Sequence, residues 1–158
     1  MSILRPQPHA LCLPATAKRD VRTQFGAVCW RLRRKKPEVL LVTTRRTRRW
    51  MVPKGWPMDG HTPAQAAAVE AFEEAGVEGQ PNDHCIGFFS YLKIIEGEEA
   101  LPCMVALFPV RVRKVHETWP EGDQRKRRWV SPRRAAELVQ EPELQAILRR
   151  FDPAALPK

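Results

Sequence analysis

The chain has 158 residues, 43% of them hydrophobic, so a single compact domain with its own core is expected. No apolar run is long enough to predict a transmembrane helix, and the first 20 residues contain too many prolines for a secretory signal. The four cysteines show no metal-ligand spacing, which favours reduced thiols in a cytoplasmic protein. The net charge of +9 predicts an anionic partner, such as a nucleic acid, a membrane surface or a polyphosphate.

The first part of the chain is predicted to be an arm followed by strands. Residues 1–20 carry prolines and mixed polarity, which is typical of an extended arm. Residues 25–33 alternate in polarity and residues 39–43 form a short apolar run, so each predicts a strand. A basic loop at residues 45–49 then leads into a short strand at residues 50–52. The folded domain is therefore expected to begin near residue 21.

The clearest local signal is a helix with both of its ends marked. Thr62 is a good N-cap residue and Pro63 suits the first helical position. Gln65 stands three residues after the cap and completes a capping box. Gly76 is a C-cap glycine, and no helix breaker lies between the two ends. The sequence therefore predicts a helix over residues 63–75.

Three carboxylates share one face of this helix. At 100° a residue, Glu73 and Glu74 lie on either side of Glu70. The small side chains of Ala66 and Ala67 share that face, so open space is expected above it, with the carboxylates directed away from the core. Like charges at this spacing, close to the negative end of the helix dipole, are locally unfavourable. Such a cluster indicates a site for a hard divalent cation, and the simpler alternative is a solvated acidic surface.

The second half of the chain predicts strands and then helices. Residues 85–95 are typical of an aromatic-rich strand. Residues 101–115 predict a long strand, broken or bulged at Pro109. After a polar loop, Ser131 and Pro132 cap and begin a second helix that extends to about residue 139.

The last segment is expected to be a third helix over residues 143–151, with residues 153–158 as a disordered tail. Strands on both sides of one helix, followed by helices at the end, predict an α/β (α+β) fold with a mixed sheet between helices. The pattern alone does not give the order of the strands.

The loop and helix around the carboxylates resemble the signature of the Nudix hydrolase family. That signature is a glycine, five residues, a glutamate, seven residues, then arginine, glutamate, an apolar residue, any residue, two glutamates, any residue, glycine and an apolar residue. The positions that match in register are Gly55, Glu70, Ala71, Glu73, Glu74, Gly76 and Val77. Two positions differ, because His61 replaces the first glutamate and Val69 replaces the arginine.

This resemblance implies a Nudix-type α/β/α sandwich over residues 21–152. It also implies that Glu70, Glu73 and Glu74 are the catalytic residues. The same glutamates would bind Mg²⁺ or Mn²⁺ together with the carbonyl of Gly55, whose lack of a side chain lets the backbone approach the metal. In the family, the arginine that Val69 replaces pairs with the acidic groups and orients them. The metal and a basic residue from elsewhere in the chain must take over this role, or activity is weak.

Within the family, the chain is most similar to diphosphoinositol polyphosphate phosphohydrolases and their bacterial relatives. The similarity lies in residues 40–57, 119–121 and 125–131. In such enzymes, basic residues at corresponding positions bind the phosphates of the substrate. The matching residues here are Arg22, Arg45, Arg46 and Arg125, with Lys54 as a further candidate.

Two functions follow from these observations. The first is a metal-dependent hydrolase that cleaves a pyrophosphate linkage in a nucleoside or inositol polyphosphate, because metals and arginines can neutralise the charge that repels the attacking water. The second is a catalytically weak Nudix module that binds RNA or a nucleotide without turnover. The expected partner is an anionic small molecule, with RNA less favoured and no membrane. The expected state is a monomer or a homodimer.

Overall fold

A computed structural model describes residues 22–94, 97 and 100–158. The predicted arm at residues 1–20, and most of the turn after residue 94, lie outside the described residues. The elements are, in chain order, β1 (Arg22–Arg33), β2 (Lys36–Thr43), β3 (Trp50–Met51), β4 (Lys54–Gly55), α1 (Pro63–Ala75), β5 (Val77–Pro81), β6 (Gly87–Lys93), β7 (Leu101–Val115), β8 (Arg127–Val130), α2 (Pro132–Leu138), α3 (Pro142–Arg150) and the 3₁₀ turn η2 (Pro153–Ala155).

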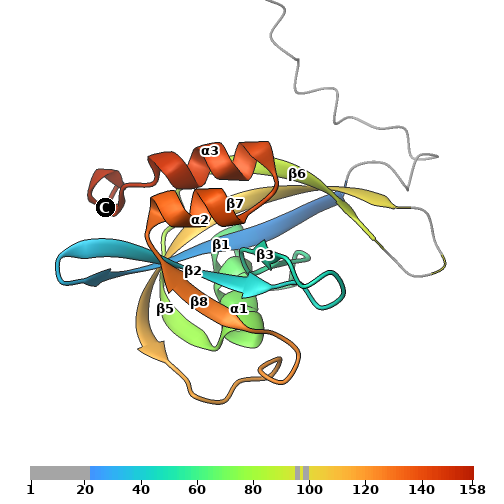
Figure 1. Cartoon of the computed structure of the whole chain (residues 1–158), viewed down its shortest axis with the longest axis horizontal. Helices are drawn as coiled ribbons and strands as arrows, with labels where there is room; N and C mark the ends of the chain where they lie inside the picture. The colour runs from blue at the N-terminus through green and yellow to red at the C-terminus, as the bar shows by residue number, and fades with distance from the viewer. Residues whose placement is uncertain (1–21, 95–96, 98–99) are drawn as a thin grey trace, which may run out of the picture.

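All the strands of the described residues belong to one mixed sheet. Its main order is β3-β2-β1-β7-β5, while β4 pairs with β1, β6 with β7 and β8 with β2. β1 and β7 run parallel to each other, and the other pairs are antiparallel. Helix α1 lies against one face, and α2 and α3 pack together on the other (Figure 1). The predicted α/β/α sandwich with a mixed sheet is confirmed.

The sheet has a hydrophobic core on each face. Successive side chains of a strand point to opposite faces, and β1 shows this alternation. Ala27 and Cys29 belong to the cluster under α1, whereas Val28 and Trp30 belong to the cluster under α2 and α3. The central strands are therefore buried on both faces, which explains their continuous apolar runs.

The predicted caps of α1 are confirmed. The Gln65 backbone N–H donates to the Thr62 hydroxyl, and the Thr62 N–H donates to the side-chain oxygen of Gln65 at 3.0 Å. Gly76 ends the helix with a φ of 67°, the left-handed conformation that glycine adopts at no steric cost. A Cβ at this position would also collide with Trp119, so the glycine is needed for packing as well. These local interactions fix where α1 begins and ends.

The predicted surroundings of α1 are wrong in one respect. Ala66 and Ala67 are fully buried and Glu74 is only 6% exposed, so the space expected above the two alanines is filled, and a cavity remains only beside Glu70 and Glu74. Helical spacing shows which residues share a face, but it does not show what covers that face. Here α1 contacts β4 as well as the longer strands of the sheet, and the loop at residues 116–126 hydrogen-bonds to its last turn.

Two further predictions need correction. β7 runs unbroken through Pro109, whose carbonyl accepts the N–H of Asn82. A residue in a strand directs its N–H and C=O to the same side. The Pro109 carbonyl faces Asn82, which lies between β5 and β6, so an N–H at this position would have had no strand to pair with. The expected disordered tail forms η2, capped by Asp152, and Leu156 packs against the core. β4 and β5 were not anticipated.

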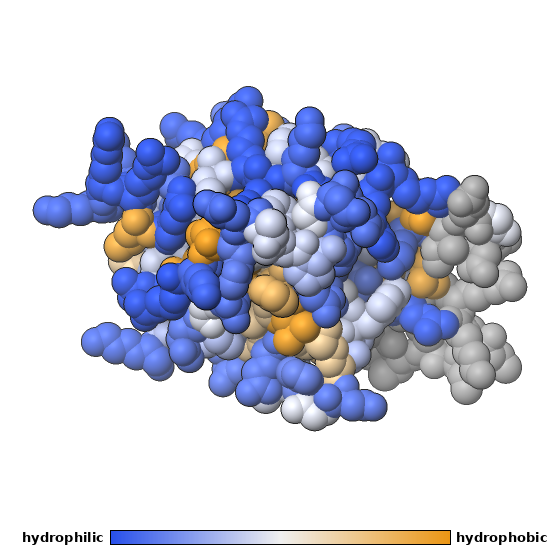
Figure 2. All heavy atoms as spheres, turned by 90° about the horizontal axis from the view of Figure 1, so that it is seen from below, coloured by the Kyte–Doolittle hydropathy of each residue, from blue (hydrophilic) through white to orange (hydrophobic). Residues whose placement is uncertain are grey.

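The described part of the chain contains no helix long and apolar enough to cross a membrane. Hydrophilic side chains predominate on the face shown in Figure 2, and hydrophobic side chains form small patches between them. In the part of the chain that the structure describes, Cys29, Cys85 and Cys103 form no disulfide.

Candidate active site

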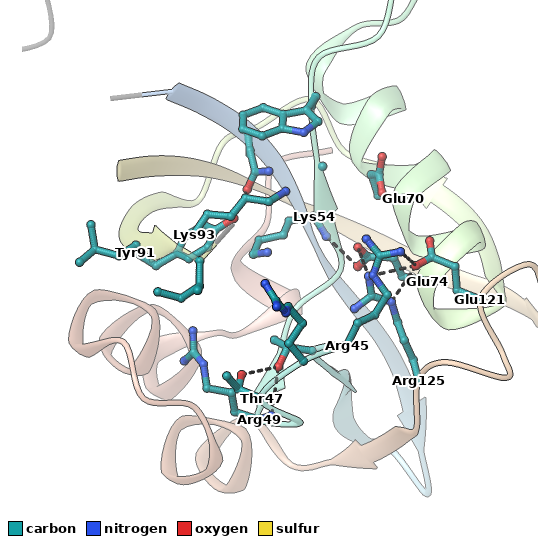
Figure 3. Close-up of a pocket in the computed structure, with 17 residues that line it drawn as sticks. Arg45, Thr47, Arg49, Lys54, Glu70, Glu74, Tyr91, Lys93, Glu121 and Arg125 are labelled. Atoms are coloured by element: carbon teal, nitrogen blue, oxygen red, sulfur yellow. Dashed lines mark hydrogen bonds and ion pairs between the residues drawn. The ribbon is translucent and has the colours of Figure 1, made fainter. Parts of the chain in front are cut away.

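A cavity of about 320 Å³ opens where β1, β4, α1 and β6 meet the loops that precede β3 and β8. Its wall carries charges of both signs (Figure 3). The acidic residues are Glu70, Glu74 and Glu121, and the basic residues are Arg45, Arg46, Arg49, Lys54, Lys93 and Arg125. Most of the predicted site residues are therefore brought to one place.

The carboxylate of Glu70 lies directly against the backbone of Gly55. A Cβ at position 55 would overlap with the carboxylate carbon and with an oxygen of Glu70. Burial, together with the nearby charges of Glu74 and Glu73, raises the pKa of Glu70 to about 7. The glycine of the signature thus makes room for an acidic side chain that is held close to other acidic side chains.

Glu74 is held by donors on both of its carboxylate oxygens. The backbone N–H of Lys54 donates to Oε2 at 3.2 Å, and Nη2 of Arg125 donates to Oε1 at 3.1 Å. Burial nevertheless raises the pKa of Glu74 to about 7, because it outweighs the opposing effects of Arg125 and Lys54. Each oxygen keeps a second lone pair, so the carboxylate can still bind a cation.

The loop at residues 116–126 and Arg127, the first residue of β8, satisfy the carbonyls at the end of α1. The last carbonyls of a helix have no partner within the helix. The carbonyl of Glu73 accepts the N–H of Glu121, and that of Glu74 accepts the indole N–H of Trp119 at 2.9 Å. Arg127 donates to the carbonyl of Ala75 at 2.8 Å and stacks on Trp119. Arg127 therefore supplies a cation that the helix dipole favours and that α1 itself lacks in its last turn.

Arg125 connects this loop to two carboxylates. Nη2 lies 3.1 Å from Glu74 and 3.0 Å from Glu121, and Nη1 donates to the carbonyl of Thr43 at 3.1 Å. Its side chain is only 10% exposed, whereas that of Arg45, which also lines the cavity, is 58% exposed. Arg125 is thus held by the protein itself, while Arg45 presents its guanidinium to solvent.

Polar side chains of Gln24, Lys54 and Tyr91 lie together on the side of the cavity formed by β1 and β6. The Tyr91 hydroxyl donates to Oε1 of Gln24, a side chain that is only 1% exposed, at 2.5 Å. The ammonium group of Lys54 lies 4.4 Å from the centre of the Tyr91 ring, and burial lowers the pKa of Lys54 to about 8. At the rim, the ammonium of Lys93 lies 4.9 Å from the centre of the Trp56 ring.

The predicted residues differ in how they relate to the cavity. Gly55, Lys54, Arg45, Arg46 and Arg125 line it together with Glu70 and Glu74. Glu73 does not line the cavity, and Arg22 lies at the exposed start of β1, opposite Cys103 in the β1–β7 pairing. The roles assigned to Glu73 and Arg22 stay predictions.

Several cavity residues were missed from the sequence. Tyr91 and Lys93 alternate along β6, so strand periodicity could have placed them on one face. Gln24 and Glu121 gave no comparable signal, because their positions depend on which strands and loops become neighbours. Glu121 was noted only as part of a short similarity, without a role.

The carboxylates suit a hard divalent ion, although the protein does not form a complete cage. Within residues 22–94, 97 and 100–158, no three histidine, cysteine, aspartate or glutamate side chains form a group that could hold a metal. Mg²⁺ is commonly bound by one or two carboxylates together with waters and substrate phosphates. Glu70 and Glu74, with their raised pKa values and oxygen donors, fit that mode of binding.

Comparison with known proteins identifies the family of this chain and agrees with its fold. The chain belongs to the NUDIX domain family, whose model matches residues 22–153. Nudix hydrolase 13, mitochondrial, of Arabidopsis thaliana is 29% identical over 145 residues, which cover 89% of this chain and 70% of that protein. Nudix hydrolase 12, mitochondrial, of the same plant is 35% identical over 119 residues, 73% of this chain and 59% of that protein. The chain is thus shorter than these curated Nudix hydrolases.

Solved structures show the same fold. The crystal structure of the C. elegans Ap4A hydrolase superposes with a TM-score of 0.57 and 23% identity, covering 82% of this chain and 94% of that one. At this identity, the likeness establishes the architecture and no more. The particular substrate has to be inferred from the residues around the cavity.

Proposed function

We propose that this chain hydrolyses a pyrophosphate linkage in a nucleoside or inositol polyphosphate, with a divalent cation bound at Glu70 and Glu74. One observation carries the proposal. A single cavity contains both the carboxylates that a hard cation needs and a group of basic side chains that a chain of phosphates needs. A surface that only solubilises the protein would not concentrate both kinds of charge in one hollow.

The metal would be held by the carboxylates of Glu70 and Glu74 and by the carbonyl of Gly55. When bound, such an ion neutralises phosphate charge and lowers the pKa of a coordinated water. Gly55 contributes by letting the Glu70 carboxylate approach β4 closely. Lys54 contributes through its backbone, because its N–H holds one oxygen of Glu74 in place.

The phosphates would be bound on the opposite wall of the cavity. Arg45 and Arg46 belong to the loop before β3, and the Arg45 side chain is largely exposed. Their charges would stabilise the negative charge that shifts to the phosphate oxygens in the transition state. Lys54 lies beside Glu74 (Figure 3), to which its backbone N–H donates, and would contact phosphates close to the bond that breaks. Trp56 at the rim would contact the uncharged part of the substrate.

A phosphate-release screen tests the function. The panel should contain an inositol pyrophosphate, a dinucleoside polyphosphate, a nucleoside triphosphate and an RNA with a 5′-triphosphate, each with Mg²⁺, with Mn²⁺ and with a chelator. Since a dinucleoside polyphosphate or a triphosphate can release other fragments, chromatography of the products accompanies the phosphate assay. We expect metal-dependent cleavage of at least one substrate by the wild-type protein, and a loss of about 100-fold or more in Glu70→Gln.

A different result would favour the other function. Tight binding of a panel member, with no cleavage under any metal condition, would identify a Nudix module that binds its ligand without turnover. Cleavage that persists at full rate in Glu70→Gln would show that the catalytic site lies elsewhere.

A further inference from the structure

The signature of this chain lacks its usual cation. Val69 occupies the position of the family's arginine, and the last turn of α1 contains no basic residue. The helix nevertheless places the half-buried carboxylate of Glu70 on the same face as the buried carboxylate of Glu74. A cation must reach this cluster from outside the helix if the carboxylates are to be held in one arrangement.

Arg125 reaches the cluster from the loop before β8. Its Nη2 contacts Oε1 of Glu74 at 3.1 Å and Oε1 of Glu121 at 3.0 Å (Figure 3). Since the Lys54 N–H already holds the other oxygen of Glu74, the two donors together fix the plane of that carboxylate. The half-buried side chain of Val69 has no polar atom, so it cannot make a comparable contact.

The backbone around Arg125 is itself fixed to the sheet. The N–H of Lys126 donates to the Thr43 hydroxyl, and the Thr43 N–H donates to the carbonyl of Lys126, both at 2.9 Å. The guanidinium adds a contact to the Thr43 carbonyl at 3.1 Å and one from Nε to Glu121 at 3.1 Å. A planar fork with five donors can make all these contacts at once, which a lysine cannot.

We propose that Arg125 is a positioning residue that takes the place of the missing signature arginine: it orients Glu74 for metal binding and does not serve mainly as a phosphate ligand. This assignment rests on the proposed function, which supplies the divalent cation. The role itself is performed in the protein before substrate binds. Arg45 is the contrasting case. It lines the same cavity, but it is largely exposed, and the carboxylate that it approaches, at 3.9 Å, is that of Glu121 and not that of Glu74.

The test measures Mn²⁺ binding to the whole chain without substrate. Electron paramagnetic resonance of the free ion monitors the binding. Arg125→Lys keeps the charge and removes the fork, so any change reports orientation and not net charge. We expect Mn²⁺ affinity to fall by about tenfold or more, the scale for losing a residue that orients a metal ligand. Arg45→Lys is the matched control, and its Mn²⁺ affinity should stay within about twofold of the wild type.

Steady-state kinetics provide a second readout. Arg125→Lys should lower kcat with little change in KM, because the residue does not bind substrate directly. A KM that rises with the number of phosphates, with unchanged Mn²⁺ affinity, would overturn the proposal and make Arg125 a phosphate ligand. If Arg125→Lys does not fold, Glu121→Gln removes a partner of Arg125 and should weaken Mn²⁺ binding in the same direction. Unchanged binding in that variant would also overturn the proposal.

The two proposals can fail separately. Weaker Mn²⁺ binding in Arg125→Lys, in a protein that cleaves no substrate, would support the positioning role and reject the hydrolase function. Metal-dependent cleavage with Mn²⁺ affinity unaffected by Arg125→Lys would do the reverse.

Discussion

The backbone of Gly55 and the carboxylate of Glu70 are in direct contact, so that no side chain fits at position 55 without moving the glutamate. The glycine of the signature is therefore needed for steric reasons in this protein, even before a metal is considered. Because β4 pairs with β1, residue 55 cannot easily move away from α1. The contact links the sheet to the acidic face of the helix.

Gly55→Ala should displace the carboxylate of Glu70 and reduce kcat by about tenfold to 100-fold, the effect expected of a small misplacement of a catalytic group. Gly60→Ala is a suitable control. Gly60 has a φ of 74°, so alanine there strains the loop, but nothing lies within 4 Å of the added Cβ. Comparable kcat losses in the two variants would mean that loop strain, and not the Glu70 contact, is responsible.

Substitutions of Glu70 and Glu74 should have opposite effects on stability. The Glu74 carboxylate accepts hydrogen bonds from the Lys54 N–H and from Arg125. In Glu74→Gln the amide NH₂ must face one of these two donors, so we expect the free energy of unfolding to fall by about 1–3 kcal/mol. Glu70→Gln removes a charge that is repelled by Glu74 and Glu73, so the metal-free protein should melt at a higher temperature. Both variants should lose at least about 100-fold in kcat. A higher melting temperature for Glu74→Gln would contradict the contacts described for its carboxylate.

The metal-free protein should lose stability as the pH rises from about 5 to 7.5. Glu70 and Glu74 have pKa values raised from 4.5 to about 7, so the folded state binds more protons than the unfolded state in this range. The expected decrease is about 2 kcal/mol, after allowing for the partial exposure of Glu70. Lys54, whose pKa is lowered to about 8, titrates above this range and acts in the opposite direction.

Melting curves at several pH values measure this decrease. Mg²⁺ binds the ionised carboxylates, so it should raise the melting temperature more at about pH 7.5 than at about pH 5. In the double variant Glu70→Gln with Glu74→Gln, the decrease attributed to these groups should be absent. An unchanged pH dependence in that variant would assign the effect to other residues.

Reversal of charge at Arg45 and Arg46 should affect long polyphosphates more than short ones. Both residues line the cavity, and Arg45 is sufficiently exposed to contact a ligand. Replacing both with glutamate should raise KM by at least about tenfold for a substrate with several phosphates, because each additional phosphate needs a cation. Arg134→Glu, on the exposed surface of α2, is the control. Equal changes in KM for a sugar-linked diphosphate and a long polyphosphate would show that the two arginines do not bind the additional phosphates.

Restoring the signature arginine should bring little benefit. Because Arg125 already pairs with Glu74, Val69→Arg adds a second cation near a cluster that has one. At the edge of the helix, a new pair with Glu73 would contribute about 0.2–0.5 kcal/mol, so kcat should change by no more than about twofold. A large gain in kcat, measured in Mg²⁺, would mean that Arg125 does not perform the role of the missing residue.

The sequence by itself determined the parts of the site that depend on neighbouring residues. The capping box at Thr62 and Gln65, the end of α1 at Gly76 and the common face of Glu70 and Glu74 all follow from interactions within a few residues. The match to the signature also identified Gly55 as a site residue, because the signature fixes the number of residues between this glycine and Glu70. These features were predicted because helix geometry is regular and its end signals are local.

Only the tertiary structure decided what covers the acidic face. Arg125 lies 51 residues from Glu74 in the sequence, and Trp119 lies 45 residues from it. Their positions depend on β8 pairing with β2, which brings the loop at residues 116–127 to the end of α1. No local pattern encodes that pairing, so the sequence predicted Arg125 as a phosphate-binding residue and Glu74 as a residue that faces away from the core. The fold buries Glu74 and gives it the cation that its own helix lacks, because a buried carboxylate is stable only when it has donors close by.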